Sequence, residues 1–407
     1  EANLGTRLNT ILQACFFSIS GILPHDEAIE RIKRAIEKTY AHKGDAVVKM
    51  NFAAVDKAEE NLFKVDYPKE VSSILELEDP VHGDAPDFVR EVLGMIMAGR
   101  GDELPVSAFP VDGTFPTGTT QYEKRNIADM VPVWDEALCT QCNKCVLICP
   151  HAAIRAKVID IEEIDEAPFS FKTYPPIGKE FNKETEVYSL QVAVEDCTGC
   201  DLCVHMCPVS SKEDPNYKAI NMMPKAPIKE QEIANWNFFI KQPDIDRTRV
   251  NAAQVKGSLF LQPLFEFSVA CSGCGETPYI KLVTQLYGEN LLIANATGCS
   301  SIFGGNLPST PYTKNSAGRG PAWSNSLFED NAEFGMGLRL AASKKRQSAF
   351  RLLEMLRADI GEELYQAIDT NTGKDEVATQ LQLQNVEHLR EVLKGINKKE
   401  ARDLEFY

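Results

Sequence analysis

Apolar residues recur every three to four positions in the N-terminal part of the chain, with charged and polar residues between them. The recurrence covers residues 8–19, 29–40 and 47–63, and such spacing is typical of amphipathic helices. Pro24 precedes the second run and Gly44 follows it, where helices commonly begin and end. The pattern therefore predicts three consecutive helices.

The helical periodicity is lost between residues 67 and 120. Prolines accumulate there, and Gly-Thr turns follow at 113–120. Because Pro and Gly interrupt helices and strands, we expect residues 78–120 to form a connecting segment that lies over its neighbours. The prolines of this region are Pro68, Pro80, Pro86, Pro105, Pro110 and Pro116.

The later part of the chain shows two further patterns. The run LLIANA at 291–296 predicts a buried strand, and the turn TGCSSIFGGN after it is rich in Gly and Ser, which indicates an α/β domain. Residues 332–407 are charge-rich and helical, and an apolar stripe predicts a pair of surface helices. The stripe consists of Leu352, Leu353, Leu356 and Ile360. We expect a multidomain fold with α/β and α+β parts.

Composition narrows the function classes. The 407 residues suffice for two to three domains. Forty-three Lys and Arg against 59 Asp and Glu give a net charge of −16, which argues against a nucleic-acid partner. No apolar run reaches the roughly 18 residues that span a bilayer, so no membrane association is expected. The start, EANLGTRLNT, lacks a signal peptide and an initiator Met, which indicates a processed chain or a fragment.

Eight of the twelve cysteines form two copies of one run. Each copy has the C-x2-C-x2-C-x3-C-P spacing of bacterial ferredoxins, in which the fourth Cys ligates the other [4Fe–4S] cube. The spacing therefore predicts two cubes with crossed ligands. One would be held by Cys139, Cys142, Cys145 and Cys207, and the other by Cys197, Cys200, Cys203 and Cys149. A pair of closed tetrahedral zinc sites is the alternative, and the two complete runs fit it poorly.

Two neighbouring cubes would pass electrons one at a time. A free-standing ferredoxin would be far shorter than this chain, so we expect the electron donor on the same polypeptide. Residues 150–196, between the two runs, exceed what a two-cluster module needs. Within them, 160–166 and 168–179 suggest an excursion with hairpin character, whose function the sequence does not indicate. Cysteines without an export signal indicate metal ligation in a reducing compartment, taken to be the cytoplasm.

Four cysteines remain outside the repeat. Cys271, Cys274 and Cys299 have C-x2-C…C spacing, which provides three of the four ligands of a third cube. Spacing alone leaves a third cluster and a zinc or redox C-x-x-C site equally open. Cys15 stands among Phe16, Phe17 and Ile19, which predicts a buried structural thiol.

The six histidines have no mutual spacing that suggests a metal site or a catalytic pair. We expect each of them to be a surface or capping residue. They are His25, His42, His82, His151, His205 and His388. The glycine pairs at 304–305 and 318–320 resemble phosphate-binding loops only loosely.

Long stretches of the chain resemble the pyruvate:ferredoxin (flavodoxin) oxidoreductases. They are ACSGCGETPYIKLVTQLYG at 270–288, ANATGCSSIFGGNLPSTPYTKNSAGRGPAWSNSLFEDNAEFGMG at 294–337, YEKRNIADMVPVWDEALCTQCNKCVLICPHAAI at 122–154, GTRLNTILQACFFSISGILPHDEAI at 5–29 and KMNFAAVDKAEENL at 49–62.

The resemblance covers essentially the whole chain and implies a central or C-terminal fragment of a longer enzyme. Residues 1–77 would end a gamma-type catalytic domain, and 121–240 would form a ferredoxin-like domain with two [4Fe–4S] cubes. Residues 241–407 would begin a thiamine-pyrophosphate-binding domain. The family's first thiamine- and substrate-binding domain would precede residue 1. Its GDG segment, which holds Mg²⁺ and the thiamine pyrophosphate, would follow residue 407.

In that family pyruvate is oxidatively decarboxylated to acetyl-CoA and CO₂. Electrons pass singly from thiamine pyrophosphate through three cubes to ferredoxin or flavodoxin. The resemblance makes Cys271, Cys274 and Cys299 ligands of the proximal cube, with a fourth ligand in the later region. It makes Glu276 and Cys299 contacts of thiamine pyrophosphate. Asn51 would contact coenzyme A, with a local capping role as the alternative. The full enzyme would be a homodimer, and no catalytic residue can be named.

Two other functions stay open. A stand-alone electron carrier would have structural zinc at Cys271 and Cys274. A pyruvate:NADP⁺ oxidoreductase would have a flavin reductase module fused downstream. The sequence decides neither between pyruvate and another 2-oxoacid nor between ferredoxin and flavodoxin.

Overall fold

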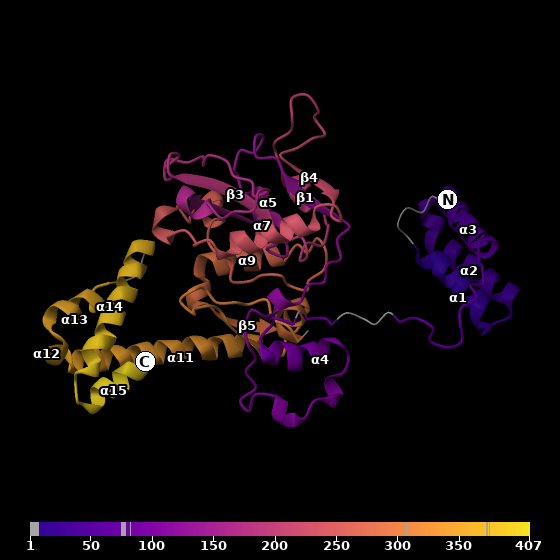
Figure 1. Ribbon diagram of the computed structural model, residues 1–407. Helices are drawn as coiled ribbons and strands as arrows, with labels where there is room; N and C mark the ends of the chain where they lie inside the picture. Colours follow the sequence, from indigo (N-terminus) through magenta and orange to yellow (C-terminus); the bar gives the residue numbers. More distant parts are fainter. Residues whose placement is uncertain (1–7, 75–78, 82, 307, 372, 374) are drawn as a thin grey trace. The chain divides into compact units, whose positions relative to one another are not determined.

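The computed structural model describes residues 8–74, 79–81, 83–306, 308–371, 373 and 375–407 (Figure 1). It divides into two compact units, residues 1–77 and 78–407. The first unit holds the three predicted helices, each of which contacts the other two. They are α1 (Asn9–Ser20), α2 (His25–Tyr40) and α3 (Asp45–Glu60), with a short turn η1 (Ala41–Lys43) between α2 and α3.

The three helices bury a small core of Ala14, Ile32, Ile36 and Val55. Ile32 and Ile36 lie one turn apart on α2, so the stripe seen in the sequence is the buried face. Cys15 packs against this core but is only partly buried, so the expectation of a buried thiol holds in part.

The Pro-rich segment has more structure than a connection. Its helical turns η2 (Val89–Leu93) and α4 (Gly94–Met97) follow one another. Val81, Ala85, Val89 and Leu93 form a small core of their own. Short 3₁₀ turns complete the segment: η3 (Gly101–Glu103), η4 (Val106–Ala108) and η5 (Thr119–Tyr122).

The cysteine repeat folds into two similar halves. Strand β1 pairs antiparallel with β4, and β2 pairs antiparallel with β3, so each half supplies one strand to each pair. The halves run β1 (Met130–Trp134), α5 (Lys144–Ile148), β2 (Ile154–Asp160) and then β3 (Glu186–Val192), α6 (Leu202–Met206), β4 (Ile220–Pro224). Helix α5 packs on α6.

The excursion expected at 160–166 and 168–179 is present, but it is the long loop that joins the hairpin strands β2 and β3 and not a hairpin itself. This loop contains the turn η6 (Ile161–Ile164) and returns to the sheet, where Tyr174 bridges to Tyr188. Helix α7 (Lys229–Lys241) then packs on β3 and buries Trp236 and Phe239 in the core of this region.

A second α/β region follows. The predicted strand is β5 (Leu292–Ala296), and it pairs in parallel with β6 (Ala322–Ser326). No residue of either strand is buried, so the expectation of a buried strand is wrong. The surrounding elements are η7 (Arg247–Arg249), α8 (Val255–Ser258), α9 (Thr277–Tyr287), η8 (Gly288–Asn290), α10 (Cys299–Ser301) and η9 (Ile302–Asn306).

The C-terminal region is more than the predicted pair of surface helices. The long helix α11 (Asn331–Met355) leads from β5 to a group of shorter helices (Figure 1). The stripe of Leu352, Leu353, Leu356 and Ile360 is buried, but it packs against residues of the later helices, which the local pattern did not reveal. These helices are α12 (Arg357–Ile360), α13 (Glu362–Asp369), α14 (Glu376–Lys394) and α15 (Lys399–Phe406).

Within the described ranges, no helix is both long enough and apolar enough to cross a membrane.

Phe239 offers a test of the core. Its side chain is fully buried among Trp236, Lys157 and the strands. We expect Phe239→Ala to lower the free energy of unfolding by about 3–5 kcal/mol, since it leaves a cavity. Asn237→Ala, on the exposed side of the same helix, should change it by less than about 0.5 kcal/mol. Anaerobic denaturation would measure both, and equal losses would contradict the packing.

Candidate metal centres

Two cavities of the cysteine-repeat region are lined by cysteines. The first contains Cys139, Cys142, Cys145 and Cys207. The second contains Cys149, Cys197, Cys200 and Cys203. Each cavity thus brings together three thiols of one run and the last thiol of the other run.

Two short helices produce this exchange. Cys145 lies in α5 and faces the first cavity, whereas Cys149, directly after the helix, faces the second. In the second run, Cys203 lies in α6 and faces the second cavity, whereas Cys207, directly after that helix, faces the first. The two cavities are therefore adjacent, and each helix connects them.

The loops before the helices have matching backbone conformations. Gln141 and Asn143 have positive φ angles of 53° and 59°, and the corresponding Gly199 and Asp201 have 65° and 63°. These angles turn backbone N–H groups toward the thiols. The N–H of Gln141 donates to Cys139 Sγ at 3.3 Å, and that of Gly199 donates to Cys197 Sγ at 3.4 Å. Such hydrogen bonds to sulfur are one of the factors that set cluster potentials.

Polar side chains that the sequence did not single out hold the first loop. Gln141 is 1 % exposed, donates to the Pro175 carbonyl at 2.9 Å and accepts from the Ile177 N–H at 2.7 Å. The excursion between β2 and β3 is thereby fastened to the first cysteine loop. Tyr188 is fully buried and donates to Asn143 Oδ1 at 2.9 Å. No local pattern in the sequence marks these contacts.

The thiols are buried enough to resist ionisation. Burial raises the pKa of Cys197 to about 12, and it raises the pKa values of Cys145 and Cys203 strongly as well. Thiolates at these positions therefore require a positively charged partner, which a bound metal supplies.

The donor sets fit an iron–sulfur cube. Zinc would hold four thiolates within about 2.3 Å of one point. Here the four thiols of each cavity come from both runs, which is the ligand pattern of a ferredoxin with two cubes. Among the described residues, no three His, Cys, Asp or Glu side chains form a group that could hold a single ion.

His151 departs from the expectation of a surface histidine. It is 2 % exposed, lines the second cavity, and its Nδ1–H donates to the Ser268 carbonyl at 2.8 Å. Burial lowers the pKa of His151 to about 4, so the ring is neutral at pH 7. His82 lies outside the described residues.

The third set of cysteines lies in a different environment. Cys271 and Cys299 are exposed and Cys274 is partly buried, and neither of the two cavities includes them. Cys271 and Cys274 share one loop, and Cys299 opens α10. Glu276 directly precedes α9, and the pKa of Tyr312 is raised mainly by burial and further by the charge of Glu276. A shared cluster at these residues stays a prediction.

Asn51 lies inside α3, within the helix expected at 47–63 and away from the helix end that a capping role would require. It is 7 % exposed, and its Nδ2 donates to the Val47 carbonyl at 2.9 Å. Thr10 Oγ1 donates to its Oδ1 at 3.5 Å. These contacts fasten α3 to α1, and a contact with coenzyme A stays a prediction.

Two family models match the chain. Residues 138–211 match a 4Fe-4S dicluster domain, and residues 75–128 match a domain of unknown function. The dicluster match includes all eight repeat cysteines. It agrees with the two cysteine cavities and supports iron–sulfur clusters in them.

Characterised relatives extend the match to nearly the whole chain. A pyruvate-flavodoxin oxidoreductase of Nostoc sp. is 51 % identical over 97 % of this chain. A pyruvate:ferredoxin oxidoreductase of Moorella thermoacetica is 49 % identical over 85 %. A pyruvate dehydrogenase [NADP(+)] of Cryptosporidium parvum is 44 % identical over 98 %. The chain spans 33 %, 29 % and 22 % of these proteins, respectively. The resemblance to the pyruvate:ferredoxin (flavodoxin) oxidoreductases is confirmed.

The crossed ligation can be tested by comparing four variants. Cys149→Ala should give the same loss of paramagnetic signal in the reduced protein as Cys200→Ala, because both remove a ligand of the second cavity. Cys207→Ala should match Cys142→Ala for the same reason. Electron paramagnetic resonance with iron analysis measures each loss. If Cys149→Ala instead matched Cys142→Ala, the exchange of ligands between the runs would be wrong.

Proposed function

We propose that this chain is the electron-relay part of a 2-oxoacid oxidoreductase that converts pyruvate and coenzyme A to acetyl-CoA and CO₂. The observation that supports it most directly is the exchange of cysteines between two adjacent cavities, since two [4Fe–4S] cubes bound there would lie side by side. Adjacent cubes accept and release single electrons. The relatives named for flavodoxin and ferredoxin suggest either protein as the acceptor.

The third cysteine loop lies against the second cavity, which suggests the direction of the relay. Ser272 Oγ donates to the Thr198 carbonyl at 3.4 Å. A Cβ atom on Gly273 would lie 3.9 Å from Cys200 Cβ. Electrons that enter near Cys271 and Cys274 would reach the cube at Cys200 first and the cube at Cys142 second. The acceptor would then dock near the first cavity.

Residues 241–407 would begin a thiamine-pyrophosphate-binding domain. Parallel sheets are usually covered on both faces, yet β5 and β6 have no buried residue in this chain. We infer that further strands and helices of the enzyme cover them. Thiamine pyrophosphate, when bound with Mg²⁺, supplies the centre at which a 2-oxoacid loses CO₂. Glu276 and Cys299 would contact it, and Cys271, Cys274 and Cys299 would ligate the proximal cube.

A second candidate is the corresponding part of a pyruvate:NADP⁺ oxidoreductase. The relative of Cryptosporidium parvum carries that name and matches 98 % of this chain. Both candidates share the relay proposed here and differ only in what accepts the electrons. We further propose a cytoplasmic homodimer.

Metal content and turnover test the proposal together. The chain, reconstituted anaerobically with iron and sulfide, should hold about eight irons in the repeat, four for each cube. It should take electrons from dithionite and pass them to a dye. We expect no CO₂ from pyruvate with thiamine pyrophosphate and coenzyme A, because no GDG segment occurs in its sequence.

Three outcomes would count against specific parts of the proposal. Zinc in place of iron in the repeat would contradict the relay. Eight irons with one zinc would favour a carrier with a structural zinc site at Cys271 and Cys274. Decarboxylation of pyruvate by the chain alone would contradict its assignment as a relay without a complete catalytic site.

A further inference from the structure

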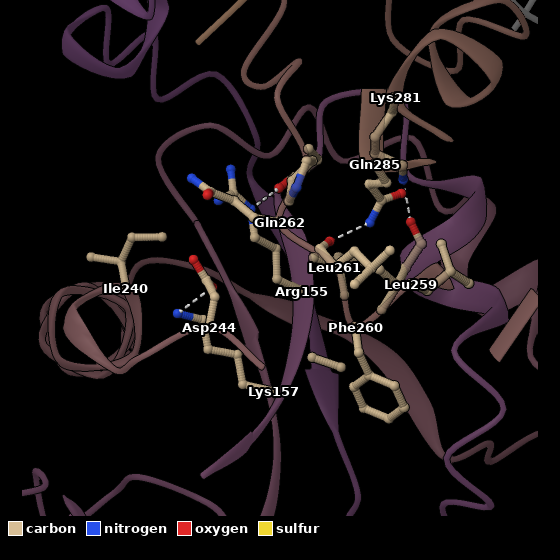
Figure 2. A pocket seen from close by; sticks show the side chains of 15 residues that line it. Arg155, Lys157, Ile240, Asp244, Leu259, Phe260, Leu261, Gln262, Lys281 and Gln285 are labelled. Atoms are coloured by element: carbon tan, nitrogen blue, oxygen red, sulfur yellow. Dashed lines mark hydrogen bonds and ion pairs between the residues drawn. The ribbon is translucent and has the colours of Figure 1, made fainter. Parts of the chain in front are cut away.

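Lys281 lies outside the cysteine repeat, yet its side chain ends at the helix that connects the two cysteine cavities. It belongs to α9, is 1 % exposed, and lies beside Gln285 in the lining of a pocket (Figure 2). Its Nζ donates to the carbonyls of Val146, Leu147 and Cys149, at 3.0 Å for Leu147 and 3.1 Å for Cys149. These are carbonyls that the end of α5 leaves without helical partners.

The contacts identify Lys281 as a buried positive charge. Three donated hydrogen bonds need three N–H groups, and only the ammonium form of lysine has three. Its partners are neutral carbonyls, and in the part of the chain that the structure describes Lys281 takes part in no ion pair. Such a charge is not screened by solvent.

The second half of the repeat contains a matching lysine in a different setting. Lys218 Nζ donates to the Val204 carbonyl at 2.7 Å and to the His205 carbonyl at 3.4 Å. Val204 follows Cys203 as Val146 follows Cys145, so the two lysines cap corresponding helix ends. Lys218 comes from the repeat itself and is partly exposed, whereas Lys281 comes from α9 and is buried.

We propose that Lys281 is a positioning residue that raises the reduction potentials of both cubes, and more strongly that of the cube ligated by Cys149. The inference rests on the proposed relay. Each cube gains one electron on reduction, without bond breaking or proton uptake, and its net charge falls by one. A fixed positive charge nearby stabilises the reduced form, most strongly where the dielectric constant is low. Lys281 contacts the backbone of the ligand Cys149 itself, whereas toward Cys145 it contacts only the residues that follow that ligand, Val146 and Leu147.

The placement would also couple the third cysteine loop to the relay. Helix α9 begins at Thr277, three residues after Cys274, and Lys281 follows one turn later. The helix that leaves the third loop thus carries the charge that makes the next cube a better electron acceptor. Electron transfer from that loop into the second cavity would be favoured as a result.

Reduction potentials test this directly. The reconstituted chain is titrated with dithionite and each cube is followed by electron paramagnetic resonance. In Lys281→Met the equilibrium constant for reduction of the Cys149-ligated cube should fall at least tenfold, which lowers its reduction potential by 59 mV for a one-electron couple. The other cube should shift less, in the same direction. Lys281→Arg should restore both potentials, and Lys218→Met should shift them less because its charge is partly exposed.

Iron content separates this inference from the proposed relay. A wild-type chain without iron–sulfur cubes would contradict the relay itself. Intact cubes with unchanged potentials in Lys281→Met would overturn the role of the charge. If Lys281→Met loses its cubes, Lys281→Gln replaces it, since its amide still donates to carbonyls without a charge. Loss of cubes in Met and Gln variants but not in Lys281→Arg would leave a purely structural role and also overturn the inference.

Discussion

Each of the two five-residue helices of the repeat contains a thiol for one cavity and is followed directly by a thiol for the other. Cys145 in α5 and Cys149 after it face different cavities, as do Cys203 in α6 and Cys207 after it. Each metal centre therefore needs cysteines from both runs, and the two helices must pack together. The pairing of β1 with β4 and of β2 with β3 satisfies this requirement, because each strand pair joins the two halves.

The surroundings of the helices are arranged to hold this geometry. Residues with positive φ angles turn the backbone of the cysteine loops toward the thiols. Gln141 binds the first loop to the excursion between β2 and β3, and Tyr188 binds it to β3. Lysines cap the helix ends, where carbonyls would otherwise be unpaired. Because buried polar groups are costly to leave unpaired, these contacts tie the cysteine loops to segments far away in the chain.

Local patterns in the sequence revealed the parts that depend on local spacing. The three N-terminal helices follow from their apolar periodicity, and the thiols that share each cavity follow from the C-x2-C-x2-C-x3-C-P spacing. Features built from distant contacts were not predictable in this way. Lys281 donates to the Val146 carbonyl from 135 positions along the chain, and the buried His151 has its hydrogen-bond partner in Ser268, 117 positions away. The stripe at Leu352 looked like a surface face because its partners, such as Leu389, lie in later helices.

The magnetic interaction between the two reduced cubes is the most direct test of the shared helices. Cys149 lies four positions after Cys145, which corresponds to a rise of about 6 Å at 1.5 Å per residue of helix. Two cubes attached at these ends must lie close enough for their unpaired spins to interact. The fully reduced chain should therefore show a broadened, interacting electron paramagnetic resonance spectrum, whereas the half-reduced chain shows separate signals. A fully reduced spectrum that equals the sum of two independent cubes would contradict the arrangement.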